Sequence, residues 1–439
     1  MHKVGVRVER AFIAHPKFSD SRASDADYDL TEAVGLAEAL GVEPIEAQII
    51  PIRDLKASNF FGSGQIENIK AAIQAHDLNI VIVNSELSPI QQRNLERVWG
   101  AKVIDRSGLI LEIFGLRAAT KEGRLQVELA RLAYERSRLV RTWTHLERQR
   151  GGTGTVAGPG ETQIESDRRI LNDKISRLKK KLENVRRTRG LQRKKRSRAP
   201  ERVVALVGYT NAGKSTLFNR LTTGGVLAQD MLFATLDTTH RILPLPSGQS
   251  AVLSDTVGFI SDLPTMLITS FRATLEEVKE ADLLLHVRDM SDPLTERRRE
   301  EVMDVLSQIE AGPEHGQEII EVWNKSDLLS DHDMASLAER AQASRDLDDM
   351  MSAYQISCLT GEGIDVLKAG IEDALTANDH VLQVKITPDA FSVRAWLHEN
   401  GQVLEESSGK LGIVEMTVRL SESDAGKFRL RHRQLLQSA

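Results

Sequence analysis

A glycine-rich segment after an apolar run carries the clearest chemical signal in the sequence. Residues 203–221 read VVALVGYTNAGKSTLFNRL and contain the pattern Gly-x4-Gly-Lys-Ser. In such a loop, backbone amides at a helix N-terminus cradle phosphates, the lysine neutralises the β- and γ-phosphates, and the serine hydroxyl ligates Mg²⁺. The sequence therefore predicts a nucleoside triphosphate site with Mg²⁺ as its cofactor. The predicted contacts of this loop are Gly208, Tyr209, Thr210, Asn211, Ala212, Gly213, Lys214 and Ser215.

A second motif, EVWNKSDLL at 321–329, indicates which base is bound. Asn324 can recognise the N7/O6 edge of a purine, and Asp327 can accept hydrogen bonds from guanine N1–H and the exocyclic amine. Adenine has neither donor, so it would leave the carboxylate unpaired at a cost of about 1–3 kcal/mol. The sequence therefore predicts GTP and GDP as ligands. The predicted base contacts, including the backbone amides of ISCLTGEG (356–363), are Asn324, Lys325, Ser326, Asp327, Ser357, Cys358 and Leu359.

Two further segments have the composition of nucleotide-dependent switches. MLFATLDTTHRIL (231–243) offers three threonines, Thr235, Thr238 and Thr239, whose hydroxyls could complete a Mg²⁺ site. DTVG (255–258) offers a carboxylate for Mg²⁺ and a glycine amide for the γ-phosphate. Loss of that phosphate would release both segments, which predicts a switch as well as a catalyst. The predicted switch contacts are Phe233, Ala234, Thr235, Leu236, Asp237, Asp255, Thr256, Val257 and Gly258.

Phe259 follows Gly258, at the position where many such enzymes carry the glutamine that orients the attacking water. Phenylalanine can neither donate nor accept a hydrogen bond. We therefore expect slow hydrolysis by the free protein and faster hydrolysis when a partner orders the switches. The rival interpretation is a scaffold that GTP merely locks in one conformation. Asn211 has two alternatives of equal weight: it helps to hold an activating K⁺ ion, or it caps the loop.

Alternating strand and helix patterns must position these motifs, and they predict a multidomain α/β protein. Over 1–118, strands are expected at 2–13, 42–50, 78–84 and 101–105, with amphipathic helices between them, as in a parallel sheet. A similar alternation over 201–378 predicts the G domain, with a mixed, mostly parallel sheet. Residues 379–439 predict a small α+β domain with strands around a Glu399–Gly401 turn. The glycines of NFFGSGQ (59–65) permit a phosphate contact but fit a plain strand-to-helix turn as well.

Residues 119–200 have a different character and predict an antiparallel two-helix linker. Two apolar seams with 4-3 spacing would pack against each other. The first seam is interrupted by Arg136. The seam residues are Leu125, Leu129, Leu132, Leu139, Trp143 and Leu146 in the first helix, and Leu171, Ile175, Leu178, Leu182 and Val185 in the second. Because the hairpin uses the one visible seam of each helix, we expect a monomer rather than a coiled-coil dimer.

Charge is segregated onto this linker. The chain has a net charge of −5, yet residues 117–198 contain 24 Lys and Arg against nine Asp and Glu. Such a basic segment on an acidic protein predicts a polyanionic partner, with a salt-laced helix surface as the alternative. Glycines between the helices would leave the tip mobile until a partner orders it. These glycines are Gly151, Gly152, Gly154, Gly158 and Gly160.

Composition places the chain in a broad class. The single cysteine, Cys358, excludes an internal disulfide and fits a reducing cytosol. No apolar run approaches the roughly 18 residues of a membrane span, and the N-terminus lacks the apolar stretch of a signal peptide. We therefore expect a cytoplasmic protein.

Taken in order, the motifs resemble those of the HflX family, in the Obg–HflX group of translational GTPases. The resemblance covers nearly the full chain. It implies an N-terminal α/β domain, a helical linker, a G domain and a C-terminal domain. It also implies binding to the large ribosomal subunit and splitting of stalled or idle ribosomes, often under stress. The stretches that carry it are LSPIQQRNLE, DRSGLILEIF, LQVELARL, WTHLERQRGG, GPGETQIESDRRI, GYTNAGKSTLFN, LFATLD, DTVGFISDLP and FRATLEEV.

The resemblance also implies individual roles. It assigns Mg²⁺ to Ser215 and Thr235. The motifs themselves predict that Asp255 holds the ion through water, and the predicted catalytic residues are Lys214, Thr235 and Gly258. The resemblance directs the glycine-rich tip toward the peptidyl-transferase centre and lays the basic linker on ribosomal RNA. An RNA-modification GTPase is the rival class. One cysteine leaves no Cys/His metal set for such chemistry, which argues mildly against it.

Overall fold

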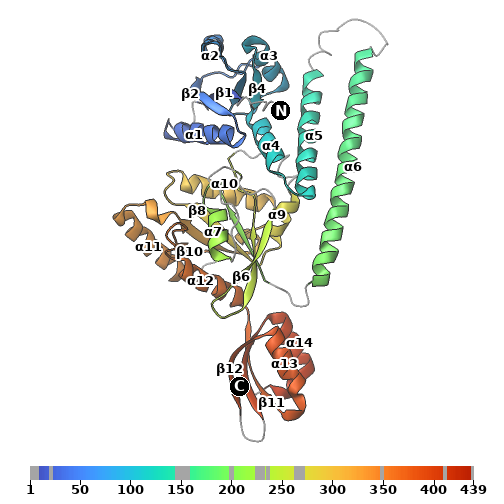
Figure 1. The fold of residues 1–439 in the computed structure, drawn as a ribbon, viewed down its shortest axis with the longest axis vertical. Coiled ribbons are helices and arrows are strands. Elements are labelled where there is room, and N and C mark those ends of the chain that lie inside the picture. Colours follow the sequence, from blue (N-terminus) through green and yellow to red (C-terminus); the bar gives the residue numbers. More distant parts are fainter. Residues whose placement is uncertain are drawn as a thin grey trace, which may run out of the picture.

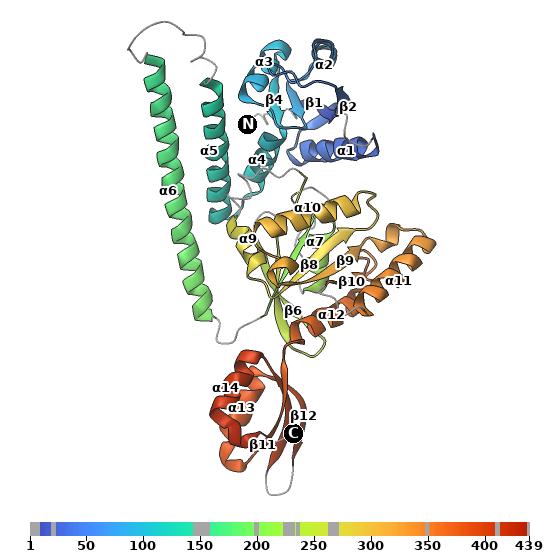
Figure 2. The same ribbon diagram turned by 180° about the vertical axis from the view of Figure 1, so that it is seen from behind.

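The computed structural model describes residues 9–18, 23–143, 159–196, 202–222, 233, 238–261, 272–346, 351–408 and 413–436. It contains a four-stranded, a six-stranded and a three-stranded sheet, in that order along the chain. Figure 1 and the reverse view in Figure 2 show these sheets one above another, with two long helices beside the first two. The predicted multidomain α/β class, with a helical linker and a small C-terminal domain, is confirmed.

The N-terminal sheet is parallel, with strand order β2-β1-β3-β4. Buried Ile and Val side chains build it, and β3 is buried along its whole length. Helices cover both faces of this sheet, as the alternating pattern predicts. The elements are β1 Arg10–Phe18, α1 Ala23–Ala39, β2 Glu43–Ile52, α2 Ser63–Ala75, β3 Ile80–Val83, α3 Pro89–Trp99, β4 Lys102–Asp105 and α4 Arg106–Arg117.

The structure bears on the expected first strand and on the glycines of NFFGSGQ (59–65). The predicted first strand at 2–13 was wrong at its C-terminal end: β1 continues to Phe18, and residues 1–8 lie outside the described residues. Pro16 fits this strand because β3 pairs only with Ala11–Ala14, so the missing amide interrupts no bond to β3. In NFFGSGQ, the Gly62 amide donates to Gln65 Oε1 at 2.9 Å, which caps α2 with its own side chain and agrees with a plain turn.

The linker is an antiparallel pair, α5 Lys121–Trp143 and α6 Pro159–Arg196 (Figures 1 and 2). Leu132, Ile175 and Leu178 are buried together, with Leu125, Leu129 and Leu171 packed at the edge of this cluster, so the predicted seam pairing is confirmed there. The rest of the first seam, with most of the tip, lies outside the described side chains. Within the described residues, no helix is long and apolar enough to cross a membrane.

The central sheet has the order β10-β9-β8-β5-β7-β6, and only β6 runs antiparallel. The carboxyl ends of β5, β8 and β9 therefore meet at one edge, where ligands of open α/β sheets bind. Its elements are β5 Val203–Gly208, α7 Lys214–Leu221, β6 Thr239–Pro244, β7 Ser250–Asp255, α9 Arg272–Lys279, β8 Leu283–Asp289, α10 Thr295–Gln308, β9 Glu318–Asn324, α11 Asp331–Asp346, β10 Met351–Gln355 and α12 Ile364–Thr376.

The C-terminal sheet is antiparallel, with order β11-β13-β12. The predicted strand turn at Glu399–Gly401 was wrong, because a helix precedes that position. Val393 and Leu397, four residues apart, are buried on one face of this helix, and Gly401 marks its C-terminal boundary. The elements are β11 His380–Ile386, α13 Phe391–Asn400, β12 Gln402–Ser408, β13 Val414–Leu420 and α14 Glu422–His432.

Candidate nucleotide site

The phosphate loop connects the buried strand β5 to α7. Lys214, the first residue of α7, is 6% exposed, and its Nζ donates to the carbonyl oxygens of Gly208 at 2.9 Å and Tyr209 at 2.6 Å. Burial lowers the pKa of Lys214 to about 8, and Asp255 opposes this shift. Gly213 has φ +97°, and a Cβ there would lie 2.1 Å from Asn324 Nδ2. Glycine is therefore required where the phosphate loop meets the base motif.

The base motif is held in place by a network of hydrogen bonds. Asn324 donates to the Ala212 carbonyl at 2.9 Å, and its Oδ1 accepts from the Cys358 amide at 3.0 Å. The Ser357 hydroxyl donates to Asp327 Oδ1 at 2.5 Å. These bonds gather the two predicted base segments and the phosphate loop at one site. Burial raises the pKa of the Cys358 thiol to about 12, so this cysteine is a neutral packing residue here.

The structure adds Asp289, which the sequence reasoning missed. Lys325 has a left-handed backbone with φ +65°, and its Nζ lies 2.7 Å from Asp289 Oδ2. The Ser291 amide and hydroxyl donate to Asp289 Oδ1 at 3.0 Å and 2.6 Å. Asp289 therefore fixes the lysine whose stem is predicted to cover the base. Its place at the carboxyl end of β8 is the sequence signal that could have found it.

Oxygen ligands suited to Mg²⁺ also lie together. The Ser215 hydroxyl donates to Asp255 Oδ2 at 3.0 Å, which places a hydroxyl and a carboxylate side by side at the loop. Hard oxygen donors of this kind are those that Mg²⁺ prefers, so the residues present fit the predicted ion. The four predicted contacts of the first switch that follow Phe233 are Ala234, Thr235, Leu236 and Asp237, and they lie outside the described residues.

The start of the second switch is paired with the phosphate loop. The Phe259 amide donates to the Gly208 carbonyl at 3.1 Å, and the Thr210 amide donates to the Phe259 carbonyl at 2.7 Å. A Cβ on Gly258 would lie 2.9 Å from Thr210 Cγ2 and 3.1 Å from Lys214 Nζ, so a larger residue here would crowd both side chains. The Phe259 ring is buried in the core with residues of β5, α9 and β8.

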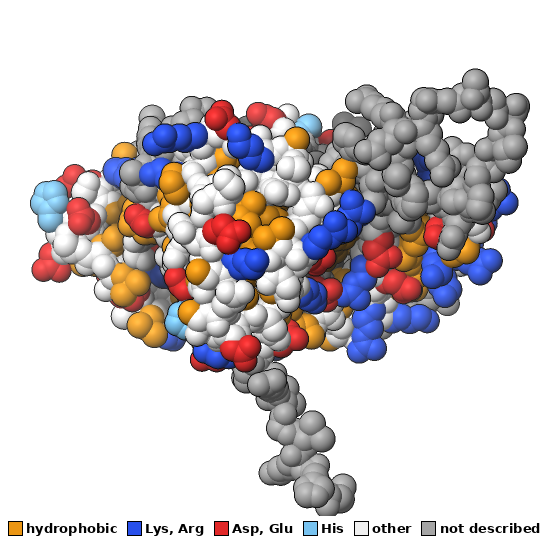
Figure 3. All heavy atoms as spheres, turned by 90° about the horizontal axis from the view of Figure 1, so that it is seen from above, with side chains coloured by type: hydrophobic (Ala, Val, Ile, Leu, Met, Phe, Trp, Pro, Cys, Tyr) orange, Lys and Arg blue, Asp and Glu red, His pale blue; other side chains and the backbone are white. Residues whose placement is uncertain are grey.

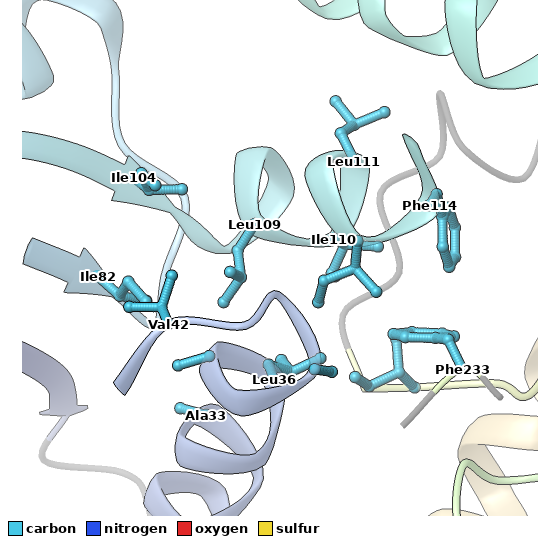
Figure 4. Close-up of a cluster of buried hydrophobic side chains, with 14 of the residues drawn as sticks. Ala33, Leu36, Val42, Ile82, Ile104, Leu109, Ile110, Leu111, Phe114 and Phe233 are labelled. Atoms are coloured by element: carbon cyan, nitrogen blue, oxygen red, sulfur yellow. The ribbon is translucent and has the colours of Figure 1, made fainter. Parts of the chain in front are cut away.

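Three predicted contacts direct their side chains into the interface with the N-terminal domain. Tyr209, Phe233 and Val257 belong to the same buried cluster as residues of α1 and α4. Phe114 of α4 meets Phe233 edge-on at 4.7 Å between ring centroids (Figure 4). Any nucleotide contact from these three residues must therefore come from their backbones.

A buried polar network joins the same two domains. Arg106 Nη2 donates to Glu32 Oε1 at 2.6 Å and to the carbonyl of Ser261 at 2.8 Å. The Tyr209 hydroxyl bonds to Glu32 and Ser261. Arg106 and Glu32 have only 6% and 7% of their side-chain surface exposed. A charged pair buried in this way is favourable only when further hydrogen bonds satisfy it, and the Ser261 carbonyl supplies one of them.

Asn211 has φ +60° and an exposed side chain. Among the described residues, its side chain makes no hydrogen bond to the loop, so the structure does not contain the predicted cap. The K⁺ contact of this side chain stays a prediction.

The sequence of this chain was compared with models of known protein families. Four family models match consecutive parts of the chain: "GTP-binding GTPase N-terminal" over 27–115, "GTP-binding GTPase Middle Region" over 117–196, "50S ribosome-binding GTPase" over 203–325, and "HflX C-terminal domain" over 337–437.

Two relatives of the same family name match most of the chain. GTPase HflX of Magnetococcus marinus is 51% identical over 79% of this chain and 77% of its own. GTPase HflX of Escherichia coli is 40% identical over 94% and 93%. A solved GTP-binding protein of Sulfolobus solfataricus, in complex with GDP, is 23% identical, with a TM-score of 0.45 over 84% of this chain and 99% of that one.

The fold and the site define a P-loop GTPase, an enzyme that binds and hydrolyses GTP. Within that class, one family is indicated, because all four models match and the relatives match over most of their length. The chain belongs to the HflX family of GTPases.

Proposed function

We propose that this GTPase binds the large ribosomal subunit, splits stalled or idle ribosomes, and hydrolyses GTP faster on the subunit than alone. The position of Phe259 is the observation that carries the proposal. Its ring lies in the core, so the residue at the usual glutamine position cannot orient the attacking water. Partner-supplied water orientation and charge can raise the rate of such a reaction about 10³–10⁵-fold.

The basic linker supplies a surface for ribosomal RNA. Arg177, Lys179, Lys180 and Lys181 of α6 are exposed, and Figure 3 shows basic side chains gathered on the side of the molecule that carries the linker. Each phosphate contact releases counterions from RNA, so this binding should weaken as salt rises. The G-domain match to 50S ribosome-binding GTPases supports the same partner. We place the protein in the cytoplasm, acting as a monomer.

The nucleotide would occupy the site assembled at the carboxyl ends of β5, β8 and β9. Lys214 would neutralise its terminal phosphates, and the Gly258 amide would bond the γ-phosphate. Ser215 and Thr235 would hold Mg²⁺, with Asp255 acting through water. When bound, the ion would supply positive charge that stabilises the charge developing on the phosphates. Asn211, whose side chain is exposed, would contact an activating K⁺.

GTP turnover of the purified protein, with and without the large subunit, tests the proposal. We expect a low basal rate in KCl and Mg²⁺ that rises at least about 100-fold with the subunit. A rate unmoved by the subunit, despite tight GTP binding, would contradict the ribosomal role and favour a scaffold. Replacing K⁺ by Na⁺ should lower the stimulated rate; an unchanged rate would remove the K⁺ contact alone.

Splitting needs a separate measurement. Light scattering of intact ribosomes should fall when the protein and a non-hydrolysable GTP analogue are added, because GTP binding alone can favour the splitting conformation. Lys214→Ala, which removes the phosphate contact, is the matched control and should leave the scattering unchanged. Subunit-stimulated turnover without any fall in scattering would restrict the function to binding.

A further inference from the structure

Arg220, near the end of α7, contacts the loop that is predicted to read the guanine. Its Nε donates to the Cys358 carbonyl at 3.0 Å, and its Nη2 donates to the Leu359 carbonyl at 2.6 Å. The planar guanidinium thus bonds two successive carbonyls of the 356–363 loop in one fixed geometry. An arginine fork has the shape for this, and a lysine does not.

The amides of this loop are not equivalent. The Ser357 amide donates to the Glu362 carbonyl at 3.0 Å, and the Cys358 amide donates to Asn324 Oδ1 at 3.0 Å. Within the described part of the chain, the Leu359 amide donates to no acceptor. Of the three predicted donors to the base, Leu359 is therefore the one whose N–H is available without breaking a bond.

The two observations concern the same peptide unit. The Cys358 carbonyl and the Leu359 amide flank one planar bond, and in a trans peptide the C=O and N–H point in opposite directions. When Arg220 holds that carbonyl on one side, it directs the Leu359 N–H to the other side. The preceding amide, that of Cys358, donates to Asn324 Oδ1, so Cys358 lies beside the base motif.

We propose that Arg220 is a specificity-determining positioning residue, which holds the Leu359 amide toward the O6 atom of guanine. The inference rests on the proposed nucleotide site and deepens it. Arg220 lies on the helix that begins at Lys214, and its side chain extends to the loop that would read the base. The phosphate-binding and base-reading parts of the site are thereby coupled by one side chain, 138 residues from its partner in the sequence.

Binding of three diphosphates to the full-length protein tests the assignment. GDP carries O6, 6-thio-GDP carries a weaker sulfur acceptor there, and inosine diphosphate keeps O6 but lacks the amine read by Asp327. In Arg220→Met, we expect GDP affinity to fall about tenfold, the size of one lost hydrogen bond. The preference for GDP over 6-thio-GDP should shrink, while the preference for GDP over inosine diphosphate should persist.

Two further variants make the result specific. Arg220→Lys keeps the charge but not the fork, so it should shift the sulfur preference in the same direction; should Arg220→Met unfold, this variant decides. Lys368→Met removes one positive charge from α12 and should leave all three affinities unchanged. An unaltered preference between GDP and 6-thio-GDP in the Arg220 variants would overturn the inference. Failure of the unmodified protein to prefer GDP over ADP would instead overturn the proposed base site.

Discussion

Phe259 forms a parallel bridge with Tyr209, because its amide donates to the Gly208 carbonyl and its carbonyl accepts from the Thr210 amide. This pairing fixes the direction of the side chain. The ring is buried in the core with residues of β5, α9 and β8. Packing therefore determines which side chain fits at position 259. A polar side chain introduced there for catalysis would lose the core contacts of the ring.

Phe259→Gln should not create a faster enzyme. The amide would be buried without partners in place of the ring, and we expect unfolding to become easier by about 3 kcal/mol with no rise in basal turnover. Thermal unfolding and phosphate release measure both effects. Phe259→Leu, which keeps an apolar side chain, should cost about 1 kcal/mol. A clear gain in basal turnover with Gln would show that the side chain can reach the attacking water.

Asp327→Asn should change the base that is bound. The new amide can donate to the oxygen that xanthine carries in place of the guanine amine, and it can no longer accept both guanine donors. GDP affinity should fall about 100-fold while xanthosine diphosphate gains, as measured by competition with a fluorescent nucleotide. Asp331→Asn, at the exposed start of α11, is the control and should alter neither. Unchanged GDP binding would exclude Asp327 as the guanine reader.

Arg106→Met should destabilise the docked domains by about 3 kcal/mol, because it leaves the Glu32 carboxylate buried without its cation. Replacing Glu32 by Met as well should recover much of that loss, since the unpaired charge is then gone. Denaturant unfolding gives both values. The exposed pair of Arg131 with Glu112 provides a contrast, and Arg131→Met should cost less than about 1 kcal/mol. A double variant no more stable than the single one would contradict this account.

The free energy of unfolding should fall in mild acid through His286. Burial lowers the pKa of this side chain to about 4, with Glu321 opposing the shift and Arg288 adding to it. The unfolded state therefore takes up the proton first, and stability present above pH 6.5 is lost as the pH falls toward 4. Between pH 6.5 and 4.5 we expect a loss of about 2 kcal/mol from this group.

Denaturant unfolding of His286→Gln at the two pH values isolates that contribution, since the variant should lack it. His15 behaves similarly, because burial and Arg106 lower its pKa to about 4 as well. His15→Gln is therefore the matched control and should retain the share that belongs to His286. Equal pH dependence in the unmodified protein and in His286→Gln would contradict the assignment.

Local patterns predicted the nucleotide-binding motifs and most of the fold. Gly-x4-Gly-Lys-Ser marks the end of a strand, a loop and the start of a helix. A periodicity of 3.6 or two residues indicates the buried face of a helix or a strand. Local patterns could not predict how the N-terminal domain packs against the G domain. The bond from Arg106 to Ser261 spans 155 residues, and no short-range pattern specifies it. Three further features depend likewise on how the strands assemble into the sheet. They are the direction of the Phe259 ring, the pairing of Lys325 with Asp289, and the hydrogen bonds of Arg220 to the 356–363 loop. The α13 helix was missed because its apolar residues are few and stand next to strand-like runs.

The linker hairpin also acts as a tether. Since α5 and α6 connect the N-terminal domain to the G domain within one chain, the contact between Arg106 and Ser261 forms without a bimolecular encounter. Tethering of this kind gives an effective concentration on the order of 1 mM. The two domains could therefore bind each other too weakly for detection as separate proteins at micromolar concentration. In the intact chain they would still be docked much of the time. Cutting the chain within the hairpin would make docking depend on dilution, without altering a single residue of the interface.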